Sequence, residues 1–192
     1  MLLITWKKIF EMKKEKIIII GTGEQAKVTI DNIEEQNKYE IFGLTKSETD
    51  KEKYSKIYGY EVVCSDNQIA NLIKENKDIV GYILGIGIGV NGNLLMRKKI
   101  YDNIDKIIKP INIIHPTAVI SKRAILGLGN IVEAYAKICN DTTIGNHCLI
   151  QSFSSVNHDQ KIGDNVMIAC NVTLAGKNID DHSIVAEGSS IG

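Results

Sequence analysis

The 192-residue sequence contains only two prolines and 6% aromatic residues, and its charges of opposite sign cancel. Lysine plus arginine number 23, and aspartate plus glutamate also number 23. The net charge therefore gives no indication of binding to nucleic acid or to a membrane, and small molecules are the expected partners. The four cysteines form no CxxC pair, so we interpret them as reduced thiols in a cytoplasmic protein.

We find no signal peptide or membrane span in the sequence. The apolar run at its start is broken by Lys7 and Lys8 and has no small-residue cleavage site. Residues 1–15 are therefore expected to form an N-terminal extension without a chemical role. With 44% hydrophobic content, the remaining chain can form two domains, which we place at residues 16–109 and 110–192.

The chain does contain a repeat with a period of six residues. Aliphatic residues occupy every sixth position, at Ile120, Leu126, Val132, Ile138, Ile144, Ile150, Val156, Ile162, Ile168 and Leu174. The period then slips by one residue and resumes at Ile179. Neither an α-helix nor an ordinary strand has this period, so the spacing predicts a parallel β-helix built from hexapeptide units. Each unit buries its aliphatic side chain only against the units above and below, so a series of units is needed for stability.

Residues 16–109 show alternating strand and helix patterns. The β-branched run 17–20 leads into Gly21-Thr22-Gly23 and then into a helical pattern, which predicts half of a nucleotide-binding unit. Further strands are expected at residues 39–44, 60–64 and 79–84, and further helices at residues 67–75 and 93–108. The pattern predicts a small, parallel, Rossmann-like α/β domain, followed by a linker at residues 110–116.

The glycine turn allows two interpretations. Gly21 and Gly23 could present backbone N–H groups to a phosphate at the positive end of the helix. The third glycine of the dinucleotide fingerprint is absent, however, and no acidic residue ends the second strand. The alternative is a tight turn that requires glycine only for its backbone angles. We do not expect a full dinucleotide cofactor, because the domain has the length of one mononucleotide-binding half.

Candidate catalytic residues lie where the repeat departs from its simple form. His158 and Asp159 follow the inward-facing Val156 at a predicted corner of the β-helix, where side chains project outward. Histidine titrates near neutral pH and can act as a general base, and an adjacent acid can select its tautomer. The alternative is an inert surface histidine, and residue chemistry alone does not separate His158 from the other three histidines. Their spacing does not resemble that of the γ-carbonic anhydrases, so no metal is expected.

The order of these parts resembles the bacterial sugar acetyltransferases of the sialic acid O-acetyltransferase (NeuD) family. The resemblance rests on IIIIGTGEQA at residues 17–26, HPTA at residues 115–118 and NHD at residues 157–159, and it covers nearly the whole chain from Lys16. Relatives include PglD-like UDP-4-amino-sugar N-acetyltransferases and perosamine N-acetyltransferases.

The resemblance implies a left-handed β-helix, assembled as a homotrimer with active sites between subunits. Acetyl-CoA would lie in the groove between two β-helices, and a nucleotide-linked sugar would be held by the α/β domain. His158 matches the family's catalytic base, and Asp159 matches the neighbouring acid. The implied function is N-acetylation of a nucleotide-linked amino sugar in bacterial surface-glycan biosynthesis. The alternatives are O-acetylation of a sialic-acid-like sugar, and a non-catalytic sugar-nucleotide-binding trimer that supports a biosynthetic partner enzyme.

The resemblance also assigns the binding sites. The substrate-binding candidates are Gly21, Gly23, Glu24, Gln25, Thr45, Lys46 and Gly87. Gln25 replaces a frequent histidine of the family, and Thr45-Lys46 replaces a common acidic pair. The acetyl-CoA candidates are Met167, which stands in place of a second histidine, and the backbone donors of Gly176, Ala186 and Glu187. Since relatives continue past Gly192 with another coil, we expect a shortened product or an incomplete acetyl-CoA site.

Overall fold

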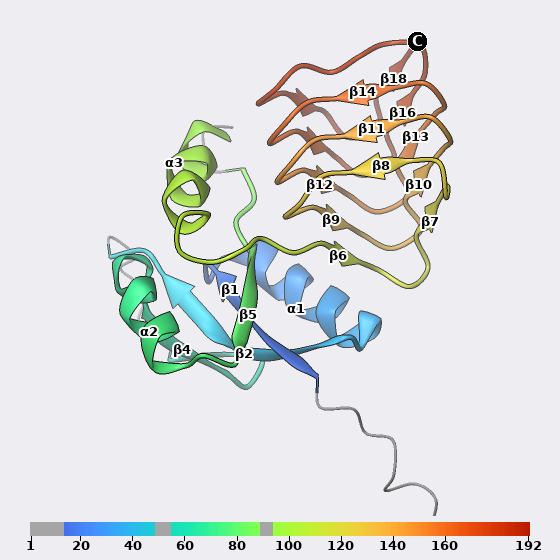
Figure 1. Ribbon diagram of the computed structural model, residues 1–192. Helices are drawn as coiled ribbons and strands as arrows, with labels where there is room; N and C mark the ends of the chain where they lie inside the picture. The colour runs from blue at the N-terminus through green and yellow to red at the C-terminus, as the bar shows by residue number, and fades with distance from the viewer. Residues whose placement is uncertain (1–13, 49–54, 89–93) are drawn as a thin grey trace, which may run out of the picture.

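The computed structural model describes residues 14–48, 55–88 and 94–192. Residues 1–13, which form most of the expected N-terminal extension, lie outside the described residues. Figure 1 shows an α/β unit followed by a stack of coils. None of the helices in the described ranges has the length and apolar character needed to cross a membrane.

The α/β unit contains a five-stranded sheet in the order β3-β4-β2-β1-β5. Its strands are β1 (Glu15–Ile20), β2 (Tyr39–Lys46), β3 (Lys56–Ile57), β4 (Tyr60–Ser65) and β5 (Ile79–Leu84). The order β4-β2-β1-β5 is parallel and is that of one mononucleotide-binding half. The four predicted strands pair in parallel as expected, and the structure adds a short strand, β3, which pairs antiparallel with β4 at one edge. The four isoleucines of β1 are fully buried, as expected for a central strand covered on both faces.

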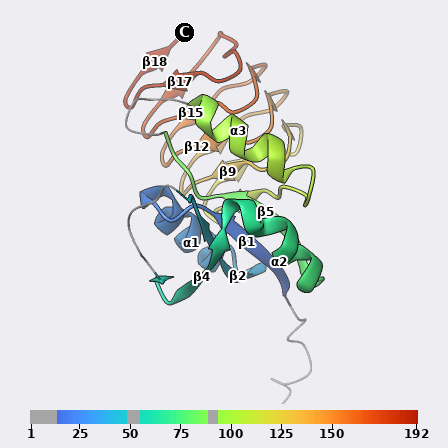
Figure 2. The same ribbon diagram turned by 90° about the vertical axis from the view of Figure 1, so that its left-hand side faces the viewer.

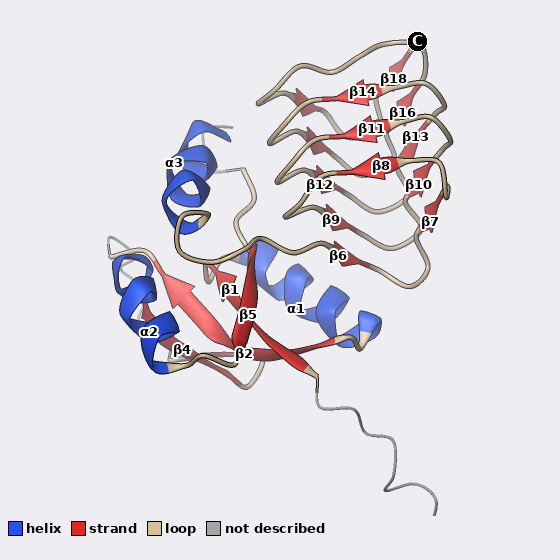
Figure 3. Cartoon of the chain, in the orientation of Figure 1, coloured by secondary structure: helices blue, strands red, loops and turns tan. Residues whose placement is uncertain are grey.

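Helices cover both faces of this sheet. They are α1 (Glu24–Gln36), the 3₁₀ helix η2 (Asp66–Gln68), α2 (Ile69–Glu75) and α3 (Leu94–Ile104). Helix α1 lies between the sheet and the first coil, whereas α2 and α3 pack on the other face (Figures 1 and 3). Helix α3 ends four residues before the predicted position and is followed by a turn, in which the carboxylate of Asp105 accepts from the Tyr82 hydroxyl and lies 3.0 Å from Nε2 of His147.

The coils form a left-handed parallel β-helix with three faces. Its strands are β6 (Ile113–Ile114), β7 (Val119–Ile120), β8 (Ile125–Leu126), β9 (Ile131–Val132), β10 (Lys137–Ile138), β11 (Thr143–Ile144), β12 (Leu149–Ile150), β13 (Ser155–Val156), β14 (Lys161–Ile162), β15 (Met167–Ile168), β16 (Thr173–Leu174), β17 (Ile184–Val185) and β18 (Ser190–Ile191). We call β6-β9-β12-β15-β17 the covered face, β7-β10-β13-β16-β18 the open face and β8-β11-β14 the three-stranded face. The coils therefore begin at β6, one unit before the repeat detected in the sequence.

The strand pairing confirms the slip in the repeat. Ile138 pairs with Val156, eighteen residues later, so one full coil is three hexapeptides. In the last coil the separation falls to seventeen residues, as in the pairing of Leu174 with Ile191. The missing residue shortens the corner after β16, where Gly176 lies.

From the corner after β8 onward, each corner of the β-helix contains one residue in the left-handed backbone conformation. The φ angle is positive at Gly129, Tyr135, Asp141, His147, Phe153, Asp159, Asn165, Asn171, Gly176, His182 and Gly188. Glycine, asparagine and aspartate adopt this conformation most readily. Histidine, which occurs at two of these corners, is also enriched in this conformation. The remaining two residues, Tyr135 and Phe153, stack with ring centroids 5.0 Å apart at the corner between the covered and open faces. The positive φ of 59° at Asp159 confirms that His158 and Asp159 lie at a corner.

Glycine is also required on the three-stranded face, where the coils approach closely. Gly127, Gly145 and Gly163 each follow the inward aliphatic residue of their unit. A Cβ atom at Gly145 would lie 2.6 Å from the carbonyl oxygen of Gly163 in the next coil. The small residue of the hexapeptide signature therefore sets the spacing between coils at this position.

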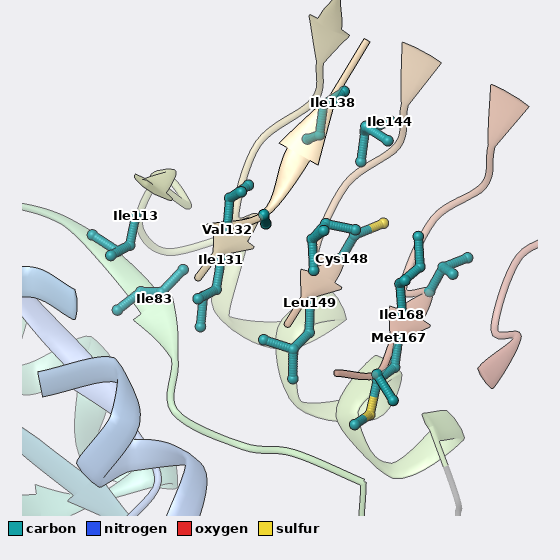
Figure 4. Packing of buried hydrophobic residues seen from close by; sticks show 14 of the residues in the cluster. Ile83, Ile113, Ile131, Val132, Ile138, Ile144, Cys148, Leu149, Met167 and Ile168 are labelled. Atoms are coloured by element: carbon teal, nitrogen blue, oxygen red, sulfur yellow. The ribbon is translucent and has the colours of Figure 1, made fainter. Parts of the chain in front are cut away.

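The covered face joins the β-helix to the α/β unit in one continuous apolar core. Its outward side chains, which include Ile113, Ile131 and Leu149, are buried against the α/β unit. Figure 4 shows Ile83 of β5 beside Ile113 and Ile131. The segment predicted as a linker is not a free connection, because its first residues extend the sheet: Ile111 N–H donates to the carbonyl oxygen of Tyr82.

Helix α3 is fixed to the β-helix by polar contacts of a buried arginine. Arg97 is 1% exposed, and its Nη1 donates to the carbonyl oxygen of His147 at 3.2 Å and to Oδ1 of Asn165 at 2.8 Å. Asn165 Nδ2 donates in return to the carbonyl oxygen of Leu94 at 2.9 Å. Figure 2 shows α3 lying along the coils. Burial lowers the pKa of Arg97 to about 10, which leaves the guanidinium charged at neutral pH.

His147 completes this contact and makes it sensitive to acid. Its ring stacks on Tyr101 with centroids 4.0 Å apart, and its Nε2 lies 3.0 Å from Oδ2 of Asp105. Burial lowers the pKa of His147 below 6.5; Asp105 and Asp164 oppose this shift, and the charge of Arg97 adds to it. The folded chain therefore favours the neutral imidazole.

We expect acid to destabilise the protein through His147. As the pH falls through the unfolded-state pKa of 6.5, the unfolded chain binds a proton that the folded chain binds less readily, so the free energy of unfolding decreases. The variant His147→Asn tolerates the left-handed backbone conformation and cannot titrate. Urea unfolding at pH values of about 7.5 and 5.5 should show a larger decrease for the natural chain than for the variant. An equal decrease would contradict this assignment.

Candidate functional site

The larger of two candidate pockets lies where the glycine loop meets the β-helix. It has a volume of about 760 Å³. The predicted substrate residues Gly21, Gly23, Glu24, Gln25 and Gly87 line it. Ile86, Met96, Ile100 and Met167 add apolar walls from the loop after β5, from α3 and from the covered face. The tertiary structure thus joins elements from both ends of the sequence around one space.

The loop glycines have different roles. Gly21 has a φ of 109°, and a Cβ atom there would lie 2.7 Å from Cγ1 of Ile86, so the loop requires glycine. Its N–H donates to the carbonyl oxygen of Thr45 at 3.0 Å. Gly23 is exposed at the start of α1, and a Cβ atom there would meet nothing within 4 Å. The positive end of α1 therefore opens into the pocket at Gly23, where an anionic group would be favoured.

An acidic residue that the sequence analysis did not select, Asp66, lies at this pocket directly after β4. Thr45 is fully buried and its hydroxyl donates to Oδ1 of Asp66, which lines the pocket. Lys46 does not line the pocket, whereas the next residue, Ser47, does. Asp66 follows β4, which pairs in parallel with β2, so the carboxyl ends of both strands meet at one edge. An acid directly after the predicted strand 60–64 was the available signal.

The second pocket surrounds His158 at the corner between the open and three-stranded faces. It has a volume of about 240 Å³. Its lining residues are Asn157, His158, Asp159, Gln160, Ala175, Gly176 and Asn178. The side chains of His158 and Asp159 are each 71% exposed, so the pair is accessible from solvent.

The hydrogen bonds of His158 select one tautomer. Its Nδ1 lies 2.6 Å from Oδ2 of Asp159. An ionised carboxylate only accepts hydrogen bonds, so the proton resides on Nδ1 and the lone pair of Nε2 remains available. This arrangement can remove a proton from a group that lies within hydrogen-bonding distance of Nε2.

Gln160 supports the turn that carries His158, and sequence reasoning missed it. It is 3% exposed, and its Nε2 donates to the carbonyl oxygen of His158 at 3.0 Å. Its Oε1 accepts from the backbone N–H of Lys177 at 3.1 Å, in the next coil. The buried glutamine thus ties the histidine turn to the shortened corner that contains Gly176.

The predicted acetyl-CoA residues do not lie together in one chain. Gly176 lines the His158 pocket, whereas Met167 is 8% exposed and lines the glycine-loop pocket. Ala186 and Glu187 are exposed at the corner between the covered and open faces and line neither of these pockets. The reason is geometric. One coil of the β-helix has about eighteen residues, so residues nine or ten apart lie on different sides of the β-helix. Within one chain, Met167 therefore cannot lie next to the group that His158 serves.

The titratable side chains of the described ranges form no metal site. No group of three or more histidine, cysteine, aspartate or glutamate side chains in these ranges could hold a metal ion. All four cysteines are free, and burial raises the pKa of the Cys148 thiol to about 12. The Cys148 thiol is therefore protonated and unreactive at neutral pH.

A parallel β-helix of hexapeptide coils, covered on one face by a mononucleotide-type α/β unit, defines a hexapeptide-repeat protein with an N-terminal α/β unit. Residues 16–104 match the PglD N-terminal domain family, and residues 141–176 match the bacterial transferase hexapeptide family (six repeats). These two matches confirm the resemblance to PglD-like hexapeptide-repeat proteins that the sequence indicated. No curated protein matches the chain significantly.

Several solved structures share the fold. The acetyltransferase domain of PglB from Neisseria gonorrhoeae, in complex with acetyl coenzyme A, has a TM-score of 0.79 and 22% identity over 92% of this chain and 82% of that chain. WeeI from Acinetobacter baumannii has a TM-score of 0.73 and 19% identity over 90% and 78%. PerB from Caulobacter crescentus, in complex with CoA and GDP-perosamine, has a TM-score of 0.64 and 20% identity over 92% and 91%.

Proposed function

We propose that the protein is an acetyl-CoA-dependent acetyltransferase that N-acetylates a nucleotide-linked amino sugar. The observation that carries this proposal is the His158–Asp159 pair, which leaves Nε2 of an exposed histidine free to accept a proton. Two structures with the same fold are described as complexes with acetyl coenzyme A, or with CoA and GDP-perosamine, and they support the substrate class. We further propose a role in bacterial surface-glycan biosynthesis and a cytoplasmic location, with which four free thiols are compatible.

In this proposal His158 acts as the general base. The amine of the sugar attacks the thioester carbonyl carbon, and His158 Nε2 takes the proton that the amine loses as the C–N bond forms. The C–S bond breaks and CoA leaves as its thiol, which recovers the proton from His158. Asp159 holds the imidazole in the reactive tautomer and stabilises its protonated form. A backbone N–H of the coil stabilises the oxyanion, and Gly176, which lines the same pocket, is the candidate donor.

The reaction needs two copies of the chain in this proposal. The sugar nucleotide occupies the glycine-loop pocket, whose residues are distinct from those around His158. A second copy would bring its own His158 to this pocket, and Met167 would then lie near the acetyl group of that combined site. Large apolar side chains on the uncovered parts of the β-helix support such an assembly: Val119, Ile125, Tyr135 and Phe153 are 58% to 66% exposed. We propose a homotrimer with three such sites, and Ala186 and Glu187 as further contacts to acetyl-CoA.

A thiol-release assay tests the proposed function. The purified chain is incubated with acetyl-CoA and a panel of UDP-, GDP- and dTDP-linked amino sugars plus sialic acid. We expect thiol release with one nucleotide-linked amino sugar, and a trimer of the 21.3 kDa chain by light scattering. If thiol is released only with sialic acid, the proposed activity is O-acetylation and not N-acetylation. If the chain binds a sugar nucleotide but neither binds acetyl-CoA nor releases thiol, the protein is the non-catalytic trimer.

A further inference from the structure

Glu133 is a buried acid without a basic partner. It follows β9 and is 4% exposed. Its Oε2 accepts from the backbone N–H and the hydroxyl of Ser152, both at 3.1 Å, and its Oε1 accepts from Nε2 of Gln25 at 3.3 Å. Among the residues that the structure describes, Glu133 forms no ion pair. A buried carboxylate with only neutral donors costs free energy that a neutral residue of the same size would avoid. Stability alone therefore does not explain Glu133.

Glu133 determines which end of the Gln25 side chain faces the glycine-loop pocket. Because an ionised carboxylate only accepts hydrogen bonds, the carboxamide must turn its NH₂ group toward Glu133. Its carbonyl oxygen then points away from Glu133, and a Cβ atom at Gly87 in the pocket wall would lie 3.8 Å from that oxygen. The side-chain nitrogen of Gln25 is thus engaged by Glu133. Gln25 therefore presents a hydrogen-bond acceptor, its side-chain carbonyl oxygen, to the pocket.

We propose that Gln25, oriented by Glu133, determines specificity by accepting a hydrogen bond from a hydroxyl or ammonium group of the sugar. This inference rests on the proposed function, because it concerns the sugar nucleotide held in the same pocket. Gln25 contacts the substrate, whereas Glu133 acts through Gln25 and is a positioning residue. Gln25, which would contact the sugar, thus belongs to α1, whereas Glu133, which orients Gln25, belongs to the β-helix.

The other polar groups of the pocket favour the same ligand chemistry. The carboxylates of Glu24 and Asp66 line the pocket and can only accept hydrogen bonds when ionised. The positive end of α1 lies at Gly23, which is where a phosphate would be stabilised. A nucleoside diphosphate linked to a sugar with hydroxyl or ammonium donors is complementary to this arrangement. A sugar carboxylate would face three acceptors, so the pocket disfavours a sialic-acid-like sugar.

Calorimetric titration of the full chain tests this proposal, with GDP-perosamine, GDP, a UDP-linked 4-amino sugar and UDP as probes. Gln25→Met keeps the length of the side chain and removes its acceptor. We expect this variant to bind the preferred sugar nucleotide about tenfold more weakly and the corresponding nucleoside diphosphate unchanged. Glu35→Met, at an exposed position of α1 outside the pocket lining, is the matched control and should bind both as the natural chain does. Equal weakening for sugar nucleotide and diphosphate, or none, would overturn the role of Gln25.

A charge exchange tests the role of Glu133. Gln25→Glu alone places two carboxylates together and should lose sugar-nucleotide binding. In the double variant Gln25→Glu, Glu133→Gln, the amide at position 133 donates to the carboxylate at position 25. The second oxygen of that carboxylate remains available as an acceptor for the ligand. We expect binding to recover in the double variant; if it remains as weak as in Gln25→Glu, Glu133 does not orient residue 25. Thermal unfolding of each variant confirms that it is folded. If the natural chain binds none of the four probes, the proposed function itself fails and this inference falls with it.

Discussion

His158→Ala is expected to reduce thiol release from acetyl-CoA by about a hundredfold or more, because it removes the general base. The side chain is exposed and its bond to Asp159 is local, so the fold should be unaffected. The affinities for acetyl-CoA and for the sugar nucleotide should change little, so the loss should appear in kcat and not in KM. The measurement is steady-state thiol release with the sugar nucleotide identified by the panel, together with calorimetric binding of both substrates.

A second histidine of the β-helix serves as the matched control. His182 has the same left-handed backbone conformation as other corner residues, and His182→Asn preserves a residue that tolerates it. This variant should retain the turnover of the natural chain. If His158→Ala also retains turnover, the general base lies elsewhere and the proposed mechanism is wrong. If both variants lose turnover together, the effect is structural.

Arg97→Ala is expected to lower the free energy of unfolding by about 3 kcal/mol. The substitution leaves the carbonyl oxygen of His147 and Oδ1 of Asn165 buried without their donor, and it opens a cavity between α3 and the β-helix. Urea unfolding at one fixed protein concentration measures the loss, because assembly also contributes to apparent stability. Arg97→Met, which keeps much of the volume but no donor, separates the cavity from the lost hydrogen bonds.

The neighbouring Lys98 provides the control for Arg97. It forms an ion pair with Asp102 at 2.6 Å, but its side chain is 40% exposed. Exposed ion pairs contribute little to stability, so Lys98→Ala should cost less than about 1 kcal/mol. A similar loss for both variants would mean that the contacts of Arg97 do not fix α3 to the β-helix.

Much of the fold could be predicted because its signals are local. A six-residue period reports a unit that repeats its backbone conformation, and the one-residue slip after Leu174 appears unchanged in the pairing of Leu174 with Ile191. The strand before Gly21 and the helix after it were equally visible. The start of the coils at β6 and the pairing of residues 109–111 with β5 were missed, because each depends on a partner distant in the sequence. The antiparallel β3 pairs locally with β4, but it was missed because a strand of two residues has no recognisable alternation.

The candidate site divides in the same way. His158 and Asp159 are neighbours in the chain, so their hydrogen bond at a corner could be anticipated from the repeat. Gln160 gave no signal, since its importance depends on the backbone of Lys177 in the next coil. Asp66 reaches the pocket because β4 lies beside β2, and Met167 reaches it because the covered face packs near α3.

The sequence by itself determined the type of each building block: the hexapeptide β-helix, the strand-glycine-helix unit and the histidine-acid pair at a corner. Periodicity and turn chemistry act between residues a few positions apart, and these can be read directly. Only the tertiary structure decided which blocks face one another. The docking of the covered face on the α/β unit placed Gln25 beside Glu133, 108 residues later in the chain, and Arg97 beside Asn165, 68 residues later. Such contacts depend on the complementary shape and polarity of whole surfaces, which no local pattern in the sequence records.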